Sequence, residues 1–219
     1  MMTPPNSAPL LREAHRATRD AQPEDLRVRI HRAISWLERA EVEKEDMDAR
    51  FIFLWISLNA AYAREFGYEQ TERDEAMRFM RKLLACDTEG RIHAVLFNQF
   101  SGPIRTLIDN KYVFEPFWRA MREHDSSELW KSKFEQAKGV ALKAIMDRDT
   151  ATVLSVVADR LHVLRNQLVH GGATWNGQAN RAQVRDAAAI LSTLMPVVID
   201  LMVHSRDVDF EAITYPWVK

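Results

Sequence analysis

The sequence predicts an all-α protein, a helical bundle of about six to eight helices. Apolar residues recur at three- and four-residue spacing over most of the chain, and no stretch shows the convincing two-residue alternation of a half-buried strand. The 219 residues, of which 47% are hydrophobic, suffice for a sizeable core. We expect one all-α domain over residues 23–206, a proline-rich flexible arm before it (1–22) and an extended tail after it (207–219).

The first helices follow from the spacing of apolar residues. Residues 24–43 carry Leu26 and Ile30 at helical spacing. Residues 49–66 are apolar nearly all round, which is typical of a central buried helix, and we expect Gly67 to end it. The next helix is expected to begin with Thr71 as its cap and to continue to about residue 85.

The middle of the chain predicts two more helices with a short aromatic stretch between them. Residues 91–108 form one helix that we expect to be broken at Ser101-Gly102-Pro103, because proline lacks a backbone donor and clashes with the preceding turn. Residues 114–122 are short and aromatic, and the stretch 114–118 within them is interpreted as core, against the alternative of a ligand-binding cluster. Residues 128–147 are helical, with a weak point at Gly139.

The last two helices enclose a glycine-containing loop. We expect residues 151–170 to be helical up to Gly171-Gly172, which supply the left-handed conformation that ends a helix. Asn180 with Gln183 three residues later resembles a capping box that opens the final helix. The apolar stretch 187–203 contains a proline and an aspartate, and we interpret it as a buried helix, so no membrane contact is expected.

Composition and charge exclude several classes of function. The net charge is −1, so any RNA contact requires a local basic patch. The single cysteine, Cys86, excludes an internal disulfide and a cysteine-based zinc site and suits a cytoplasmic location, as does the lack of a signal-peptide pattern. The glycine patterns of nucleotide-binding loops are absent, and the seven histidines form no compact ligand set. We therefore expect no metal and no cofactor.

One polar stripe stands out on the helix that ends at Gly171. With about 100° per residue and Arg165 as the origin, four other polar residues fall within about 140° of arc: Asp159, His162, Asn166 and His170. The opposite arc is apolar and predicts the core face: Leu154, Val157, Leu161, Leu164, Leu168 and Val169. Arginine, amide and imidazole groups bind and cleave phosphates elsewhere, so the stripe is the candidate site.

The string Arg165-Asn166-Gln167-Leu168-Val169-His170 resembles the signature of the HEPN superfamily (higher eukaryotes and prokaryotes nucleotide-binding domain). That signature is an arginine, a polar residue after it and a histidine that closes a window of four to six residues. The similarity also includes the two glycines at the helix end and the apolar helix near residue 55, and it extends over about residues 45–205.

The resemblance implies a helical homodimer that works as a metal-independent endoribonuclease, with its cleft where two signature helices meet. It assigns Arg165 and His170 as the catalytic pair and Asn166 as their auxiliary. Many members of the superfamily are toxins, phage-defence effectors or RNA-processing nucleases, and a toxic activity held off by an antitoxin or regulatory protein is a third alternative. Others are inactive and bind a nucleotide or a partner protein, which is the alternative function.

The chemistry of RNA cleavage agrees with these residue types. The 2′-OH is the nucleophile, and its attack needs a base, an acid for the leaving 5′-oxygen and positive charge near the phosphate. Histidine performs either proton transfer near neutrality, and the arginine fork matches two phosphate oxygens. One chain supplies one His170, so a two-fold interface would bring a second one to the cleft.

Each candidate also has a structural interpretation. Arg165 could pair with a carboxylate, His170 could bond the last carbonyls of its helix, and Asn166 could be a solvated position. For the neighbouring residues we weigh a supporting role against an ordinary structural one: His162, Asp159 and Asn59. Three more residues are candidates for RNA binding, two as phosphate contacts and one as a base-stacking ring, although all three are also common surface or core features: Arg181, Arg185 and Trp175.

Overall fold

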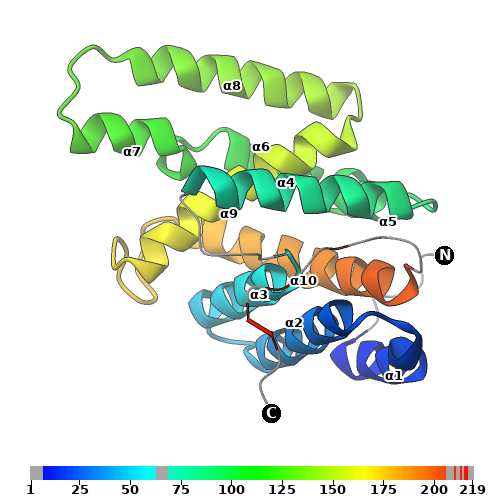
Figure 1. The fold of residues 1–219 in the computed structure, drawn as a ribbon. Coiled ribbons are helices and arrows are strands. Elements are labelled where there is room, and N and C mark those ends of the chain that lie inside the picture. Colours follow the sequence, from blue (N-terminus) through cyan, green and yellow to red (C-terminus); the bar gives the residue numbers. More distant parts are fainter. Residues whose placement is uncertain (1–6, 63–68, 206–209, 211–212, 214, 217–219) are drawn as a thin grey trace. The chain divides into compact units, whose positions relative to one another are not determined.

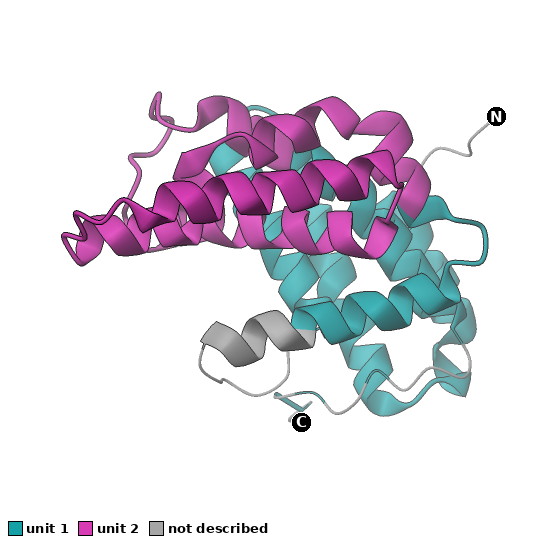
Figure 2. Ribbon diagram, turned by 90° about the horizontal axis from the view of Figure 1, so that it is seen from above, with its two compact units in different colours: residues 1–92, 188–219 teal, residues 93–187 magenta. Residues whose placement is uncertain are grey.

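The protein is all-α, as the sequence predicts. A computed structural model describes residues 7–62, 69–205, 210, 213 and 215–216, and these residues contain ten α-helices and no strand (Figure 1). Ten is slightly more than the expected six to eight, because short helices occur between the long ones. Where a single domain was expected over 23–206, the chain divides into two compact units (Figure 2). Unit 1 comprises residues 1–92 and 188–219, and unit 2 comprises residues 93–187.

Unit 1 is built on an antiparallel helix pair, α2 (Glu24–Val42) and α3 (Met47–Tyr62). Two buried side chains fix the register of this pair. The hydroxyl of Ser57 donates to the carbonyl of Ala33 at 2.7 Å, and Nη1 of Arg29 donates to the carbonyl of Ala61 at 3.2 Å. Because backbone carbonyls accept both bonds, the two helices cannot slide without losing them. The rest of the unit consists of α1 (Ala8–Thr18), a 3-10 turn (Arg19–Ala21), α4 (Glu69–Cys86) and the C-terminal part of α10 (Arg181–His204).

The expected flexible arm contains a packed helix, which corrects the prediction over residues 8–18. In α1 the side chains of Leu11 and His15 are buried, and the N–H of Ala8 donates to Glu41 of α2 at 3.0 Å. Arg12 also forms an ion pair with Glu38. The prolines that suggested disorder precede the helix or lie in its first turn, where a missing N–H costs nothing.

Two predicted helix boundaries in unit 1 remain to be compared with the structure, those at Thr71 and Gly67. α4 begins at Glu69, so Thr71 lies inside the helix and does not cap it. The proposed stop at Gly67 lies outside the described residues, as does most of the tail. Within the tail, Phe210 is buried with its ring 5.7 Å from that of Phe79, and the carbonyl of Tyr215 accepts a bond from Arg32.

Unit 2 contains two long helices, α8 and α9, and several short ones. The expected break in the helix over 91–108 occurs earlier than Pro103: a π-helical turn (Val95–Gln99) ends at Phe100, and a new helix starts at Ser101. Pro103 therefore lies in a first helical turn, which tolerates it. Gly139 does not interrupt its helix. Helix α5 (Arg91–Ala94) runs from unit 1 into unit 2. The other elements of unit 2 are α6 (Ser101–Ile108), a 3-10 turn (Lys111–Val113), α7 (Glu115–Arg122), α8 (Leu129–Met146), α9 (Thr150–Val169) and the first part of α10.

The core of unit 2 holds a buried arginine. The guanidinium carbon of Arg160 lies 4.6 Å from the ring centroid of Phe114 and 5.7 Å from that of Phe134, and Nη1 donates to the carbonyl of Val113. Burial lowers the pKa of Arg160 to about 10, against an opposing effect of Asp159. Phe117 is buried, in agreement with the interpretation of this aromatic stretch as core. The arginine thus joins α9 to α7 and α8.

Within the described part of the chain, α10 alone is long and apolar enough to cross a membrane by length and composition. Two thirds of its most apolar window, 67%, is buried inside the protein. Core helices of soluble proteins commonly pass the same test, which makes the finding weak evidence for a membrane span.

Candidate functional site

Helix α9 presents the polar stripe as a surface feature and packs its apolar arc. Asp149 caps the helix by accepting from the N–H of Thr152 at 3.1 Å, and Gly171 ends it with a φ of 71°. Four of the six expected core positions are fully buried: Leu154, Val157, Leu161 and Leu164. Leu168 is half-buried, but Val169 is 54% exposed, because the helix ends there and leaves the core.

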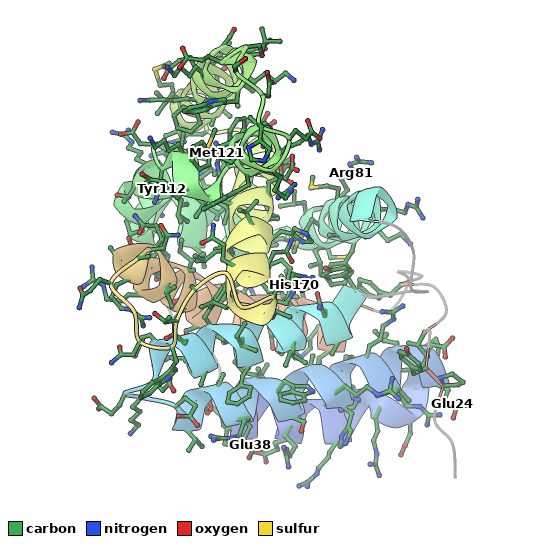
Figure 3. All side chains as sticks on the ribbon, turned by 90° about the vertical axis from the view of Figure 1, so that its left-hand side faces the viewer. Glu24, Glu38, Arg81, Tyr112, Met121 and His170 are labelled. Carbon is green, nitrogen blue, oxygen red and sulfur yellow. The ribbon has the colours of Figure 1, made fainter. Side chains whose placement is uncertain are left out.

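The three candidate catalytic residues lie together at the C-terminal end of α9. Arg165 and Asn166 are half-buried, and Nη1 of Arg165 donates to Oδ1 of Asn166 at 2.9 Å. His170 is exposed, and its backbone N–H donates to the carbonyl of Asn166 at 3.0 Å (Figure 3). The side-chain amide of Asn166 therefore orients Arg165. The backbone carbonyl of Asn166 holds the backbone of His170.

The two supporting residues on α9 continue the stripe toward the core. His162 and Asp159 are half-buried, one and two turns before Asn166. Asp159 lies close enough to Arg160 to favour the charged form of that guanidinium. Asp159 thus stabilises the charge of the buried Arg160 as well as belonging to the polar stripe.

The glycine loop folds back against the end of α9. A Cβ on Gly172 would lie 3.2 Å from the carbonyl oxygen of Gln167, and the N–H of Ala173 donates to that oxygen at 3.0 Å. A glycine at position 172 permits this close approach. Trp175, at the outer part of the loop, is 74% exposed, so its ring is available to solvent.

A closed ring of hydrogen bonds holds the loop in place. Asn110 donates through Nδ2 to Oδ1 of Asn180 (3.4 Å), and Asn180 donates through Nδ2 to Oε1 of Gln167 (2.7 Å). Gln167 donates through Nε2 to the carbonyl of Tyr112, and the N–H of Tyr112 donates to Oδ1 of Asn110 at 2.8 Å. We call these four residues the amide ring. It joins α9, the glycine loop and the 3-10 turn before α7.

Sequence reasoning missed the amide ring. Asn180 has a left-handed φ of 56°, and its side chain bonds Asn110 and Gln167 across the unit, where a capping box with Gln183 was expected. Gln167 lies inside the signature string, and an amide side chain directly before Leu168 and Val169 is the signal that could have pointed to it.

The two candidate phosphate contacts differ in their surroundings. Arg181 is half-buried, and Nε donates to the carbonyl of Gly177 at 3.1 Å, so this arginine also stabilises the loop. Arg185 is exposed and lies 3.9 Å from the carboxylate of Asp186. Arg181 is thus the better ordered of the two cations.

Asn59 belongs to α3 of unit 1, whereas all the other candidates belong to unit 2. It is half-buried, and its Oδ1 is buried with no hydrogen-bond partner among the described residues. Its role toward Arg165 stays a prediction.

In the described ranges, no group of three or more histidine, cysteine, aspartate or glutamate side chains could hold a metal ion. No protein-family model, no curated protein and no solved structure matches the chain.

Proposed function

We propose that the protein is a metal-independent endoribonuclease of HEPN type, with Arg165, Asn166 and His170 as its catalytic residues. The observation that carries the proposal is the arrangement at the end of α9: a half-buried arginine oriented by an adjacent amide, one turn from an exposed histidine. The resemblance rests on these residues and on the helical fold around them. The reaction requires a guanidinium and two imidazoles, and one chain supplies the guanidinium and one of the imidazoles.

The proposed chemistry assigns one task to each group. An imidazole removes the proton of the 2′-OH, the 2′-oxygen attacks the phosphorus, and a second imidazole protonates the leaving 5′-oxygen. Arg165 contributes a fixed positive charge to the pentacoordinate transition state, because its fork matches two phosphate oxygens. Products are a 2′,3′-cyclic phosphate and a free 5′-OH.

The need for two imidazoles supports a homodimer. One chain places one His170 at the end of α9, and the exposure of that residue leaves it accessible to a second copy. A two-fold axis beside the helix end would bring two His170 and two Arg165 side chains to one phosphate. A dimer of this kind is part of the proposal, as is restraint by an antitoxin or regulatory protein.

The alternative is an inactive HEPN module that binds a nucleotide or a partner protein. The bond between Arg165 and Asn166 favours it, because a guanidinium held by its own helix has fewer donors left for a phosphate.

Cleavage of a labelled RNA pool in EDTA separates the two functions. We expect the wild-type protein to produce 2′,3′-cyclic phosphate ends, and His170→Ala and Arg165→Ala to lower the rate at least about a hundredfold. Intact RNA with folded wild-type protein, or equal rates for wild type and His170→Ala, would contradict the nuclease.

Matched controls lie elsewhere in unit 2. Arg105 is an exposed arginine of α6, and His124 is an exposed histidine after α7. We expect Arg105→Ala and His124→Asn to retain the wild-type rate; asparagine suits position 124 because the backbone there has a φ of 51°. Circular dichroism and sedimentation of every variant check fold and association.

A further inference from the structure

The ring of Tyr112 is exposed although its backbone is firmly held. The side chain is 45% exposed, whereas its carbonyl accepts bonds from Gln167 and from the indole N–H of Trp118 (2.8 Å). Its N–H is bonded to Asn110. Three hydrogen bonds thus hold a residue that is nearly half exposed.

Neighbouring aromatic rings fix the orientation of this side chain. The Tyr112 ring meets Phe117 edge to face, with centroids 5.5 Å apart at 90°, and lies 6.4 Å from the ring of Trp118. Trp118 itself packs on Phe117 at 5.1 Å. Because Phe117 is buried, the exposed ring rests on the core and has little rotational freedom to lose on binding.

A cation accompanies the rings. The ammonium of Lys111 lies 5.1 Å from the centroid of Tyr112, 5.5 Å from that of Phe117 and 5.9 Å from that of Trp130. The surrounding unit is also basic: residues 93–187 contain thirteen lysines and arginines against ten aspartates and glutamates, a net charge of +3. Rigid aromatic faces beside cations are the features by which proteins bind single-stranded nucleic acid.

The amide ring connects this surface to the candidate catalytic residues. Gln167, which donates to the carbonyl of Tyr112, lies three residues before His170 on α9, a rise of about 5 Å. In Figure 3, His170 is labelled at the lower end of α9 and Tyr112 higher up, on the other side of that helix. A chain of nucleotides is long enough to contact both.

We propose that Tyr112, with Trp118 and Lys111 beside it, is a stacking surface for the bases of single-stranded RNA next to the candidate cleavage site. Gln167 is the positioning residue that holds this surface in register with His170. The inference rests on the proposed function for the identity of its ligand. It adds the requirement that the RNA be unpaired, because a base within a duplex cannot present its face to a tyrosine.

The test uses a ligand that the protein cannot cut. A fluorescein-labelled, 2′-O-methylated single strand of about 12 nucleotides lacks the nucleophile, so fluorescence anisotropy measures binding alone. We expect Tyr112→Phe, which retains the ring, to bind within about twofold of wild type, and Tyr112→Leu to bind about tenfold more weakly. Lys111→Gln should lower the slope of log affinity against log salt by about 0.7.

Controls separate stacking from damage to the fold. Trp36 in α2 is a partly exposed aromatic of unit 1, and Trp36→Leu should leave the affinity unchanged. Thermal unfolding of Tyr112→Leu and Tyr112→Phe should coincide. Equal affinity of Tyr112→Leu and wild type, equal affinity for duplex and single strand, or no binding by wild type would each overturn the inference.

The same variants distinguish failure of this inference from failure of the proposed function. Binding that depends on Tyr112, with no cleavage of the matching 2′-OH strand, overturns the nuclease and retains the RNA surface. Cleavage that is independent of Tyr112 retains the nuclease and overturns the stacking surface.

Discussion

Each unit buries an arginine that donates to a backbone carbonyl, but the two arginines have different neighbours. Arg29 in unit 1 is 1% exposed and ties α2 to α3 through the carbonyl of Ala61. Arg160 in unit 2 is 4% exposed and lies over two phenylalanine rings. The buried arginine of unit 1 therefore joins two helices through a backbone carbonyl, whereas the buried arginine of unit 2 also packs over aromatic rings.

The two units also differ in net charge. Unit 1 contains seventeen basic and twenty-one acidic residues, a net charge of −4, whereas unit 2 has a net charge of +3. The overall value of −1 conceals this difference. Attraction of a polyanion depends on local potential, so the charge difference favours unit 2 over unit 1 for the proposed RNA contact.

The largest expected effect is on the rate of RNA cleavage, when a half-buried arginine of each unit is replaced by lysine. Arg165→Lys keeps the charge but loses the planar fork, and we expect RNA cleavage to slow about a hundredfold. Its counterpart in unit 1 is Arg50, also half-buried and bonded to a neutral polar group, Oγ of Ser192 at 3.1 Å. Arg50→Lys should leave the rate within about twofold. Equal losses in both variants would refute the assignment of chemistry to unit 2.

Ion pairs should matter more in unit 1. Asp200 is 8% exposed and its Oδ2 lies 2.7 Å from Nη1 of Arg91, so Asp200→Ala leaves a partly buried guanidinium without this partner. We expect the free energy of unfolding in urea to fall by about 2–3 kcal/mol. In unit 2 the pair of Arg119 and Glu115 is exposed, and Arg119→Ala should cost less than about 0.5 kcal/mol. Similar costs would show that burial does not set the strength of these pairs.

A buried histidine makes unit 1 sensitive to acid. Burial, helped by the positive charges of His31, Arg19 and Arg27, lowers the pKa of His15 to about 4. The unfolded chain binds this proton near its usual pKa of about 6.5, so between the two values the unfolded state holds more protons. Stability is therefore complete above about pH 6.5 and is lost as the pH falls toward about 4.

We expect this loss to be about 2 kcal/mol, since water near the imidazole reduces the full effect of the lowered pKa. His15→Leu should flatten the dependence of unfolding free energy on pH across that range while leaving stability at neutral pH similar or higher. A variant with the same pH dependence as wild type would show that other groups cause the acid sensitivity.

The helices could be predicted because apolar spacing reports them directly. The predicted helices over 24–43 and 128–147 agree with α2 and α8 to within one residue at each end. Their arrangement in two units could not be predicted, because α10 runs through the boundary between them without a change in composition. Helix α1 was missed because an eleven-residue helix next to prolines offers few apolar positions to count.

For the candidate site, the spacing of the stripe on α9 predicted which residues lie on one face. The amide ring could not be predicted, since it joins side chains that are far apart in sequence, such as Asn110 and Asn180, and depends on how the loop returns to the helix. Tyr112 was overlooked for the same reason: its exposure follows from tertiary packing.

Removal of side-chain hydrogen bonds offers a smaller test of stability, with an expected loss of about 1 kcal/mol in each unit. Ser57→Ala removes the buried bond between α2 and α3, and Gln167→Ala removes two bonds of the amide ring, so each should lower stability by about 1 kcal/mol. The unit 2 variant alone should expose residues 171–180 to limited proteolysis, because it frees the loop. Equal cleavage of both variants would show that the ring does not hold the loop.

Replacement of the two buried arginines by methionine compares the units through small changes in the free energy of unfolding. Arg160→Met replaces a cation whose charged form burial disfavours with an apolar chain, whose sulfur can contact the rings of Phe114 and Phe134. We expect its unfolding free energy to change by less than about 1 kcal/mol, because the desolvation cost that is relieved offsets the lost hydrogen bond and ring contacts. Arg29→Met loses the bond to the carbonyl of Ala61 that ties α2 to α3 and should cost about 2 kcal/mol. If Arg160→Met were instead the more damaging change, the arginine–aromatic contact would be the main stabilising feature of unit 2, and the rings near α7 would depend on that charge for their positions.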